Sequence, residues 1–139
     1  MTIFRAALTY YGIIFACGTA LGILRTMLLV PRLGSTAATA LEIPVMLALS
    51  WLVCGAILRR FAVPMRIPAR IAMGAIALAM LWLSEALLAM ALGAGASGFF
   101  IAFTTPAGAL GALAQIAFAA FPALRHRTGL GVRDDQRLH

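Results

Sequence analysis

The chain has 139 residues, of which 63% are hydrophobic and 11% are charged, and its formal net charge is +7. An ordinary soluble domain has roughly 45–50% apolar and 25% charged residues, and a small one leaves much of its surface in water. The mean hydropathy of +1.02 therefore excludes a small soluble domain and also a disordered chain. The composition predicts an integral membrane protein.

Four long apolar runs follow one another along the chain, and each has about the 20 residues that a helix needs to cross a bilayer. The runs predict transmembrane helices over residues 6–30, 36–58, 71–92 and 99–122. The first run is too long for the apolar part of a cleaved signal peptide, so we expect it to be retained. The runs lack the alternation of membrane β-strands. The expected fold is an all-α four-helix bundle over residues 1–124.

Two local features modify this scheme. Thr104, Thr105 and Pro106 predict a distortion within the fourth helix, because a proline removes a backbone donor. Residues 125–139 are polar and rich in arginine and aspartate, which predicts a disordered tail on the cytoplasmic side.

The basic residues are all arginines, and they are distributed unevenly about the four runs. With four spans, the N-terminus, the connection between the second and third runs and the C-terminal tail share one side of the membrane. These regions hold Arg5, Arg59, Arg60, Arg66, Arg70, Arg125, Arg127, Arg133 and Arg137. The positive-inside rule then predicts that both termini are cytoplasmic. The abundance of Ala, Gly and Arg, without Lys or Asn, is typical of GC-rich bacteria, so we expect a multi-pass protein of the bacterial inner membrane.

The same arginines suggest which partners the chain has besides the bilayer itself. Arg59, Arg60, Arg66 and Arg70 are expected to lie on anionic lipid headgroups, at about 1 kcal/mol for each residue near the surface. Nucleic acid is not an expected partner, because the arginines flank apolar runs. The sequence leaves open a homo-oligomer or a larger membrane complex.

Three ionisable residues, Arg25, Glu42 and Glu85, fall within the apolar runs. A charge at the centre of a membrane helix costs roughly 2.5–3.5 kcal/mol, so such residues are candidate functional groups. A helical rise of about 1.5 Å per residue places all three in the outer half of the bundle. We predict that Arg25 contacts Glu85, and the sequence leaves open that Glu42 is the partner or that Arg25 reaches the interface unpaired.

The role of Glu42 depends on where the second helix begins relative to Pro44. If the helix begins near Ile43, Pro44 lies in its first turn and Glu42 caps it near the interface. If the helix begins earlier, Pro44 lies inside it and Glu42 is buried. We take the first arrangement as the expectation.

Small and polar residues form a stripe on each predicted helix. Gly18 and Gly22 on the first helix, and Gly108 and Gly111 on the fourth, are the candidates for close helix packing. Thr104 and Gln115 form a second polar stripe on the fourth helix.

No sequence motif supports a catalytic, cofactor or metal site, so we expect no cofactor and no enzymatic activity. Both histidines, His126 and His139, lie in the tail, which excludes a haem held by two histidines within the membrane. The expected role is a structural or accessory membrane subunit. The alternative is a small oligomeric transporter or channel that uses the layer of Arg25, Glu42 and Glu85.

Three segments carry a family resemblance, namely GTALGILRTMLLVPRLG (18–34), LEIPVMLALSW (41–51) and TPAGALGALAQIAFAAFP (105–122). They resemble a group of small, uncharacterised four-helix proteins of the bacterial inner membrane. The resemblance implies the fold and the location, and it implies no activity.

Overall fold

The structure is a computed structural model that describes residues 1–128, and these residues form helices and short connections without any strand. The all-α class is therefore confirmed. In chain order the elements are α1 (Thr2–Leu24), a π-helical turn η1 (Arg25–Leu29), α2 (Val30–Arg60), α3 (Ile67–Ala91), α4 (Gly95–Ala102) and α5 (Pro106–Thr128). Residues 129–139 of the predicted tail lie outside the described residues.

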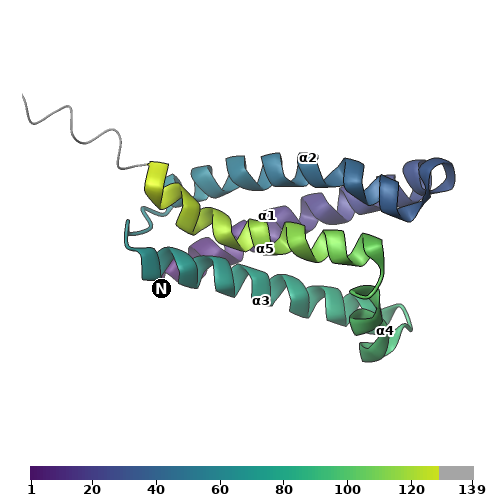
Figure 1. The fold of residues 1–139 in the computed structure, drawn as a ribbon. Coiled ribbons are helices and arrows are strands. Elements are labelled where there is room, and N and C mark those ends of the chain that lie inside the picture. Colours follow the sequence, from purple (N-terminus) through teal and green to yellow (C-terminus); the bar gives the residue numbers. More distant parts are fainter. Residues whose placement is uncertain (129–139) are drawn as a thin grey trace, which may run out of the picture.

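Three helical stretches are long and apolar enough to cross a membrane, namely Thr2–Arg60, Ile67–Ala91 and Pro106–Arg125. The first stretch turns back on itself at Gly34, whose φ of 78° and ψ of 165° are essentially restricted to glycine. Figure 1 shows α1 and most of α2 running in opposite directions on the two sides of this reversal. The bundle therefore has four long helical arms, as the four apolar runs predicted. In chain order the arms are α1 with η1, the part of α2 that follows Gly34, α3, and α5.

The end of the first arm is wider than an α-helix. The N–H of Val30 donates to the carbonyl of Arg25, which is the five-residue spacing of a π-helix. Such turns are rare and often occur at functional sites. Arg25 is the first residue of this turn, so the unusual backbone coincides with an ionisable side chain.

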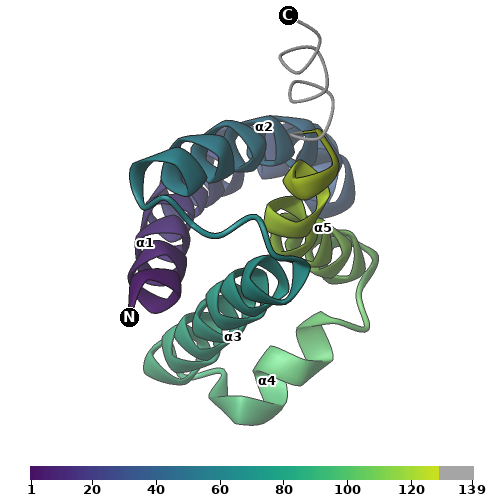
Figure 2. The same ribbon diagram turned by 90° about the vertical axis from the view of Figure 1, so that its left-hand side faces the viewer.

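The four arms are arranged as a ring in which α1 contacts α2, α2 contacts α5, α5 contacts α3, and α3 contacts α1. Figure 2 shows this ring along the axis of the bundle, with α4 outside it beside α3. The N-terminus, the connection from α2 to α3 and the end of α5 lie at one end of the bundle (Figure 1). We call this the terminal end, and the opposite one, which contains Gly34 and α4, the far end.

The fourth predicted helix, 99–122, is not continuous. It is divided into α4 and α5 by the connection Phe103–Thr105, so the distortion expected here is confirmed and the single helix is wrong. The hydroxyls of Thr104 and Thr105 each donate to a carbonyl three residues back, at 2.7 Å. Thr105 Oγ1 also accepts the N–H of Gly108 at 3.1 Å, which caps the first turn of α5.

The buried core lies in the terminal half of the bundle. Its members are Ala6, Ala7, Tyr10, Ile14, Cys54, Ile57, Leu58, Val63, Met73, Ala77, Leu81 and Phe118. This cluster has no member in α2 before Cys54 or in α3 after Leu81, so it does not extend to the far end.

Candidate functional site

Arg25 forms an ion pair with Glu42 across the reversal of the chain. Arg25 Nε lies 2.9 Å from Glu42 Oε2, and the two side chains are 29% and 16% exposed. Arg25 Nη1 also donates to Thr39 Oγ1, and Thr39 is buried. The guanidinium thus has two partners on α2, which fix the end of the first arm against the second.

The position of Glu42 follows from where the second arm begins. α2 is helical on both sides of Pro44, so the expectation that Pro44 lies in a first turn and that Glu42 is a cap is wrong. One turn of helix separates Thr39 from Glu42, and both side chains therefore face Arg25.

Glu85 has a different partner from the one that the sequence predicted. Glu85 Oε1 accepts a hydrogen bond from Gln115 Nε2 at 2.6 Å, and Gln115 Oε1 accepts one from Trp82 Nε1 at 2.7 Å. The prediction that Arg25 contacts Glu85 is therefore wrong, because the carboxylate that pairs with Arg25 is that of Glu42. The chain from Trp82 through Gln115 to Glu85 joins α3 to α5, as the ion pair joins η1 to α2.

The two hydrogen-bonded systems line a single cavity of about 710 Å³ in the middle and far part of the bundle. We call it the polar cavity. Its polar lining residues are Thr19, Arg25, Thr26, Thr39, Glu42, Ser50, Glu85 and Gln115, and its apolar ones include Ile14, Phe15, Met46, Leu81, Leu88 and Phe118. The volume lies within the range of about 300–1,000 Å³ that is usual for small-molecule sites. The three ionisable residues thus line one cavity, although they pair differently from the prediction.

Tyr10 and Phe118 close the terminal end of the polar cavity. Their rings stack with centroids 4.4 Å apart, and the Tyr10 hydroxyl donates to the carbonyl of Phe118 at 3.1 Å. The same hydroxyl lies 3.4 Å from the carbonyl of Ser50. One fully buried side chain therefore connects three arms beneath the cavity.

The four glycines predicted to pack helices closely have other positions. A Cβ added at Gly22 or Gly111 would meet nothing within 4 Å, and one at Gly18 would make only an ordinary contact with Met46. Those three residues line the polar cavity, so their predicted packing role is wrong. Gly108 is crowded by the carbonyl of Ala102 at the turn that precedes its own helix.

Close helix approach occurs instead at Gly74, and Gly55 is crowded by a side chain; neither is among the four glycines predicted to pack helices. A Cβ on Gly74 would collide with the backbone carbonyl of Ala119, where α3 crosses α5. A Cβ on Gly55 would collide with the guanidinium of Arg125, which lies 4.3 Å from the ring centre of Trp51. No short sequence motif marks these positions.

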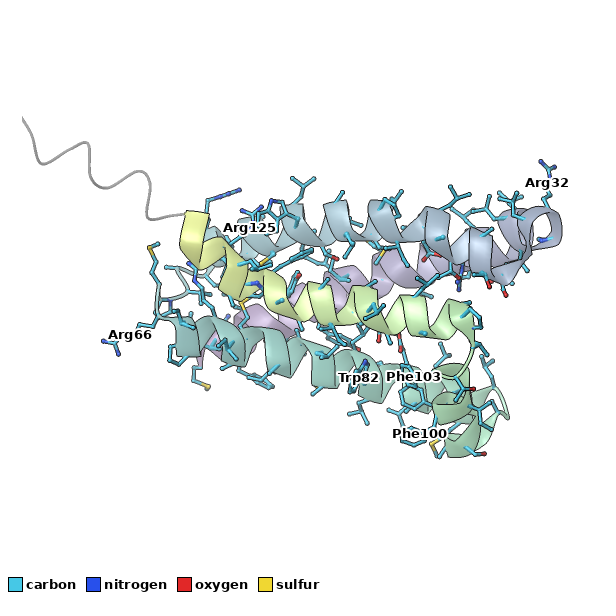
Figure 3. The ribbon with its side chains drawn as sticks, viewed as in Figure 1. Arg32, Arg66, Trp82, Phe100, Phe103 and Arg125 are labelled. Atoms are coloured by element: carbon cyan, nitrogen blue, oxygen red, sulfur yellow. The ribbon has the colours of Figure 1, made fainter. Side chains whose placement is uncertain are left out.

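Of the second polar stripe, only Gln115 reaches the candidate site. Thr104 is exposed in the connection before α5, and its hydroxyl donates to the backbone of α4. Trp82, which is 39% exposed, contributes its ring nitrogen to the Gln115 hydrogen bond and packs edge-on against Phe103 at 6.2 Å. Figure 3 shows the Trp82 and Phe103 rings near each other beside α3.

The arginines of the terminal end divide into exposed and buried ones. Arg59, Arg60 and Arg66 are exposed, and Figure 3 shows Arg66 pointing away from the bundle. Arg70 is only 6% exposed, and it donates to the backbone carbonyls of Pro64 and Pro122, each at 3.4 Å. The expectation of a headgroup contact is therefore wrong for Arg70, which joins the connection before α3 to α5.

Within residues 1–128, no group of three or more His, Cys, Asp or Glu side chains lies close enough to hold a metal ion. Comparisons of the chain with protein-family models, with curated proteins and with solved structures find no match. The candidate function therefore depends on the polar cavity itself.

Proposed function

We propose that the chain is a four-span protein of the bacterial inner membrane that binds a small amphipathic molecule in the polar cavity. The observation that carries this proposal is the cavity of about 710 Å³ with two separate hydrogen-bonded systems in a mainly apolar wall. Ligand sites typically combine a mainly apolar lining with a few fixed polar groups. Ionisable groups within a membrane domain are costly, and a binding role accounts for that cost.

The charge distribution supports an orientation with both termini in the cytoplasm. Arg5, Arg59, Arg60 and Arg66 are exposed at the terminal end, whereas Arg32 lies at the far end (Figure 3). Under the positive-inside rule the polar cavity belongs to the outer half of the membrane. Alkaline phosphatase fused to the C-terminus should then be inactive, and a fusion between Gly93 and Gly98 should be active. The reverse pattern would contradict this topology.

A purely structural or accessory role is the weaker proposal. A bundle that only supports a partner gains stability from close packing, and an open polar cavity lowers it. The buried floor formed by Tyr10 and Phe118 also argues against a continuous channel through one chain. A transporter would require this floor to separate, either within one chain or in a homo-oligomer.

We further propose that the cavity binds its ligand without catalysis. The hydroxyl nearest the ion pair, that of Thr39, accepts a hydrogen bond from Arg25. A threonine nucleophile would also have to donate its own proton to an adjacent base, and within residues 1–128 Thr39 makes no such hydrogen bond.

Filling the cavity tests the binding proposal. Gly22 lines the polar cavity with open space around it, so Gly22→Leu should place a side chain inside and displace the ligand. Gly12 lies on the same helix with equally open surroundings and is exposed, so Gly12→Leu is the matched control. Native mass spectrometry of the detergent-purified proteins should show a small-molecule adduct on the wild type and on Gly12→Leu, and a reduced adduct on Gly22→Leu. Equal adducts on both variants would contradict the proposal, provided that circular dichroism shows both to be folded.

A further inference from the structure

The charges on the wall of the polar cavity do not balance. The wall contains one guanidinium, that of Arg25, and two carboxylates, those of Glu42 and Glu85. The ion pair at 2.9 Å uses Arg25 and Glu42 together, and their charges cancel. This leaves the carboxylate of Glu85 as the one charged group of the wall that no ion pair within residues 1–128 neutralises.

The surroundings of Glu85 are suited to a donor from a ligand. Its described hydrogen bond is to Oε1, from the neutral amide of Gln115 at 2.6 Å, which leaves Oε2 for a further donor. The amide is itself fixed by Trp82, so the carboxylate is held in one orientation toward the cavity. A carboxylate in a mainly apolar site binds a cationic donor more tightly than a neutral one, because the hydrogen bond is charge-assisted.

The remainder of the wall is suited to an apolar ligand body. Leu81 and Leu88 lie on α3 close to Glu85, and Ile14, Phe15 and Met46 face them from α1 and α2. An anion is disfavoured here, because Arg25 is already engaged by Glu42 and Thr39 while Glu85 would repel it. A neutral lipid chain would fill the apolar part and leave the carboxylate without a counter-charge.

We propose that the polar cavity selects amphipathic organic cations, with a protonated amine at Glu85 and an alkyl or aryl part along the apolar wall. This inference rests on the proposed function, and it adds the chemical class of the ligand. The amine has two possible sources, a free alkylamine or the amine of a membrane lipid, and both present the same donor to the carboxylate.

The test uses three probes with the same chain length, namely dodecylamine, dodecanol and dodecanoate. Each is radiolabelled and bound at neutral pH to the full chain in phosphatidylcholine nanodiscs, and binding to protein-free nanodiscs is subtracted. We expect saturable binding of dodecylamine about tenfold or more tighter than that of dodecanol, as a charge-assisted hydrogen bond implies. Dodecanoate should bind most weakly.

Two variants assign the preference to the carboxylate. Glu85→Gln keeps the shape and one acceptor oxygen for Gln115 but removes the charge, so it should bind dodecylamine and dodecanol equally. Ser84→Ala is the control, because Ser84 is the neighbouring residue but bonds Tyr11 outside the cavity lining, at 2.5 Å. It should keep the full preference for the amine. A preference that persists in Glu85→Gln would overturn the assignment.

The outcomes separate this inference from the proposed function. Equal binding of dodecylamine and dodecanol to the wild type would overturn the cation inference while leaving a ligand-binding cavity. Absence of saturable binding for all three probes would overturn both. Nanodiscs that contain phosphatidylethanolamine distinguish the two sources: competition with dodecylamine identifies a lipid amine, and unchanged binding identifies a free one.

Discussion

Glu42 Oε2 lies 2.9 Å from Arg25 Nε, although the chain reverses its direction between the two residues. The pair therefore closes the far end of the first two arms, where the buried core does not extend. Arg25 supplies two interactions there, one to the carboxylate and one to the hydroxyl of Thr39. An ion pair in this position links the shape of the polar cavity to the stability of the fold.

The first prediction concerns the two halves of this pair. Breaking a buried ion pair by removing one partner costs about 3–5 kcal/mol, whereas replacing both can be nearly neutral. Because Arg25 is 29% exposed, we expect the lower end, about 3 kcal/mol, for Arg25→Leu and for Glu42→Leu. The double variant should recover most of the lost free energy of unfolding, measured by reversible unfolding in mixed detergents.

An exposed arginine supplies the control for this cycle. Arg32→Leu makes the same chemical change at an exposed site and should alter stability little. If Glu85→Leu, and not Glu42→Leu, gave the loss that a second change at Arg25 restores, the pairing described here would be incorrect.

The second prediction concerns the reversal at Gly34. Its φ of 78° with ψ of 165° belongs to a region that side chains with a Cβ scarcely adopt. Gly34→Ala should therefore destabilise the protein by about 1–3 kcal/mol, although nothing lies within 4 Å of the added Cβ. Gly22→Ala, in a helical conformation with equally open space, should be neutral or stabilising by up to about 1 kcal/mol. Equal effects of the two changes on thermal unfolding would contradict backbone strain as the cause.

The third prediction concerns the crossing of α3 and α5 at Gly74. A Cβ there would overlap the backbone carbonyl of Ala119, and a backbone yields less readily than a flexible side chain. Gly74→Ala should cost at least about 2 kcal/mol and lower the yield of monodisperse protein in size-exclusion chromatography. Gly12→Ala, with nothing within 4 Å, is the control for the substitution itself. Wild-type behaviour of Gly74→Ala would mean that the two helices can separate without loss.

The helical class and the positions of the arms follow from the sequence because each depends on local properties. Runs of about 20 apolar residues suffice for membrane helices, and Thr104, Thr105 and Pro106 suffice to place the break before α5. Arg25, Glu42, Glu85 and Gln115 could likewise be selected, because polar groups within apolar runs are costly.

The pairing of these groups depends on rotations and depths that one sequence does not determine. The reversal at Gly34 and the π-helical turn at Arg25 change how the first two arms face each other, and together they favour Glu42 over Glu85. The hydrogen bond from Trp82 to Gln115 could not be predicted either, because nothing in the sequence shows that the two side chains lie side by side. The spacing of Gly18 and Gly22 is that of a packing motif, but their arm faces the cavity at that depth.

The last prediction separates two roles of arginine at the terminal end. Arg70 is buried and donates to the carbonyls of Pro64 and Pro122, whereas Arg66 is exposed. Removing either side chain takes one positive charge from the same end, so both changes weaken the positive-inside signal alike. Arg70→Ala also leaves two carbonyl groups without their donor, which should cost about 2 kcal/mol and expose the connection before α3 to hydrogen exchange. Arg66→Ala should alter stability by less than about 0.5 kcal/mol. Equal hydrogen exchange in the two variants would show that charge alone explains the presence of Arg70.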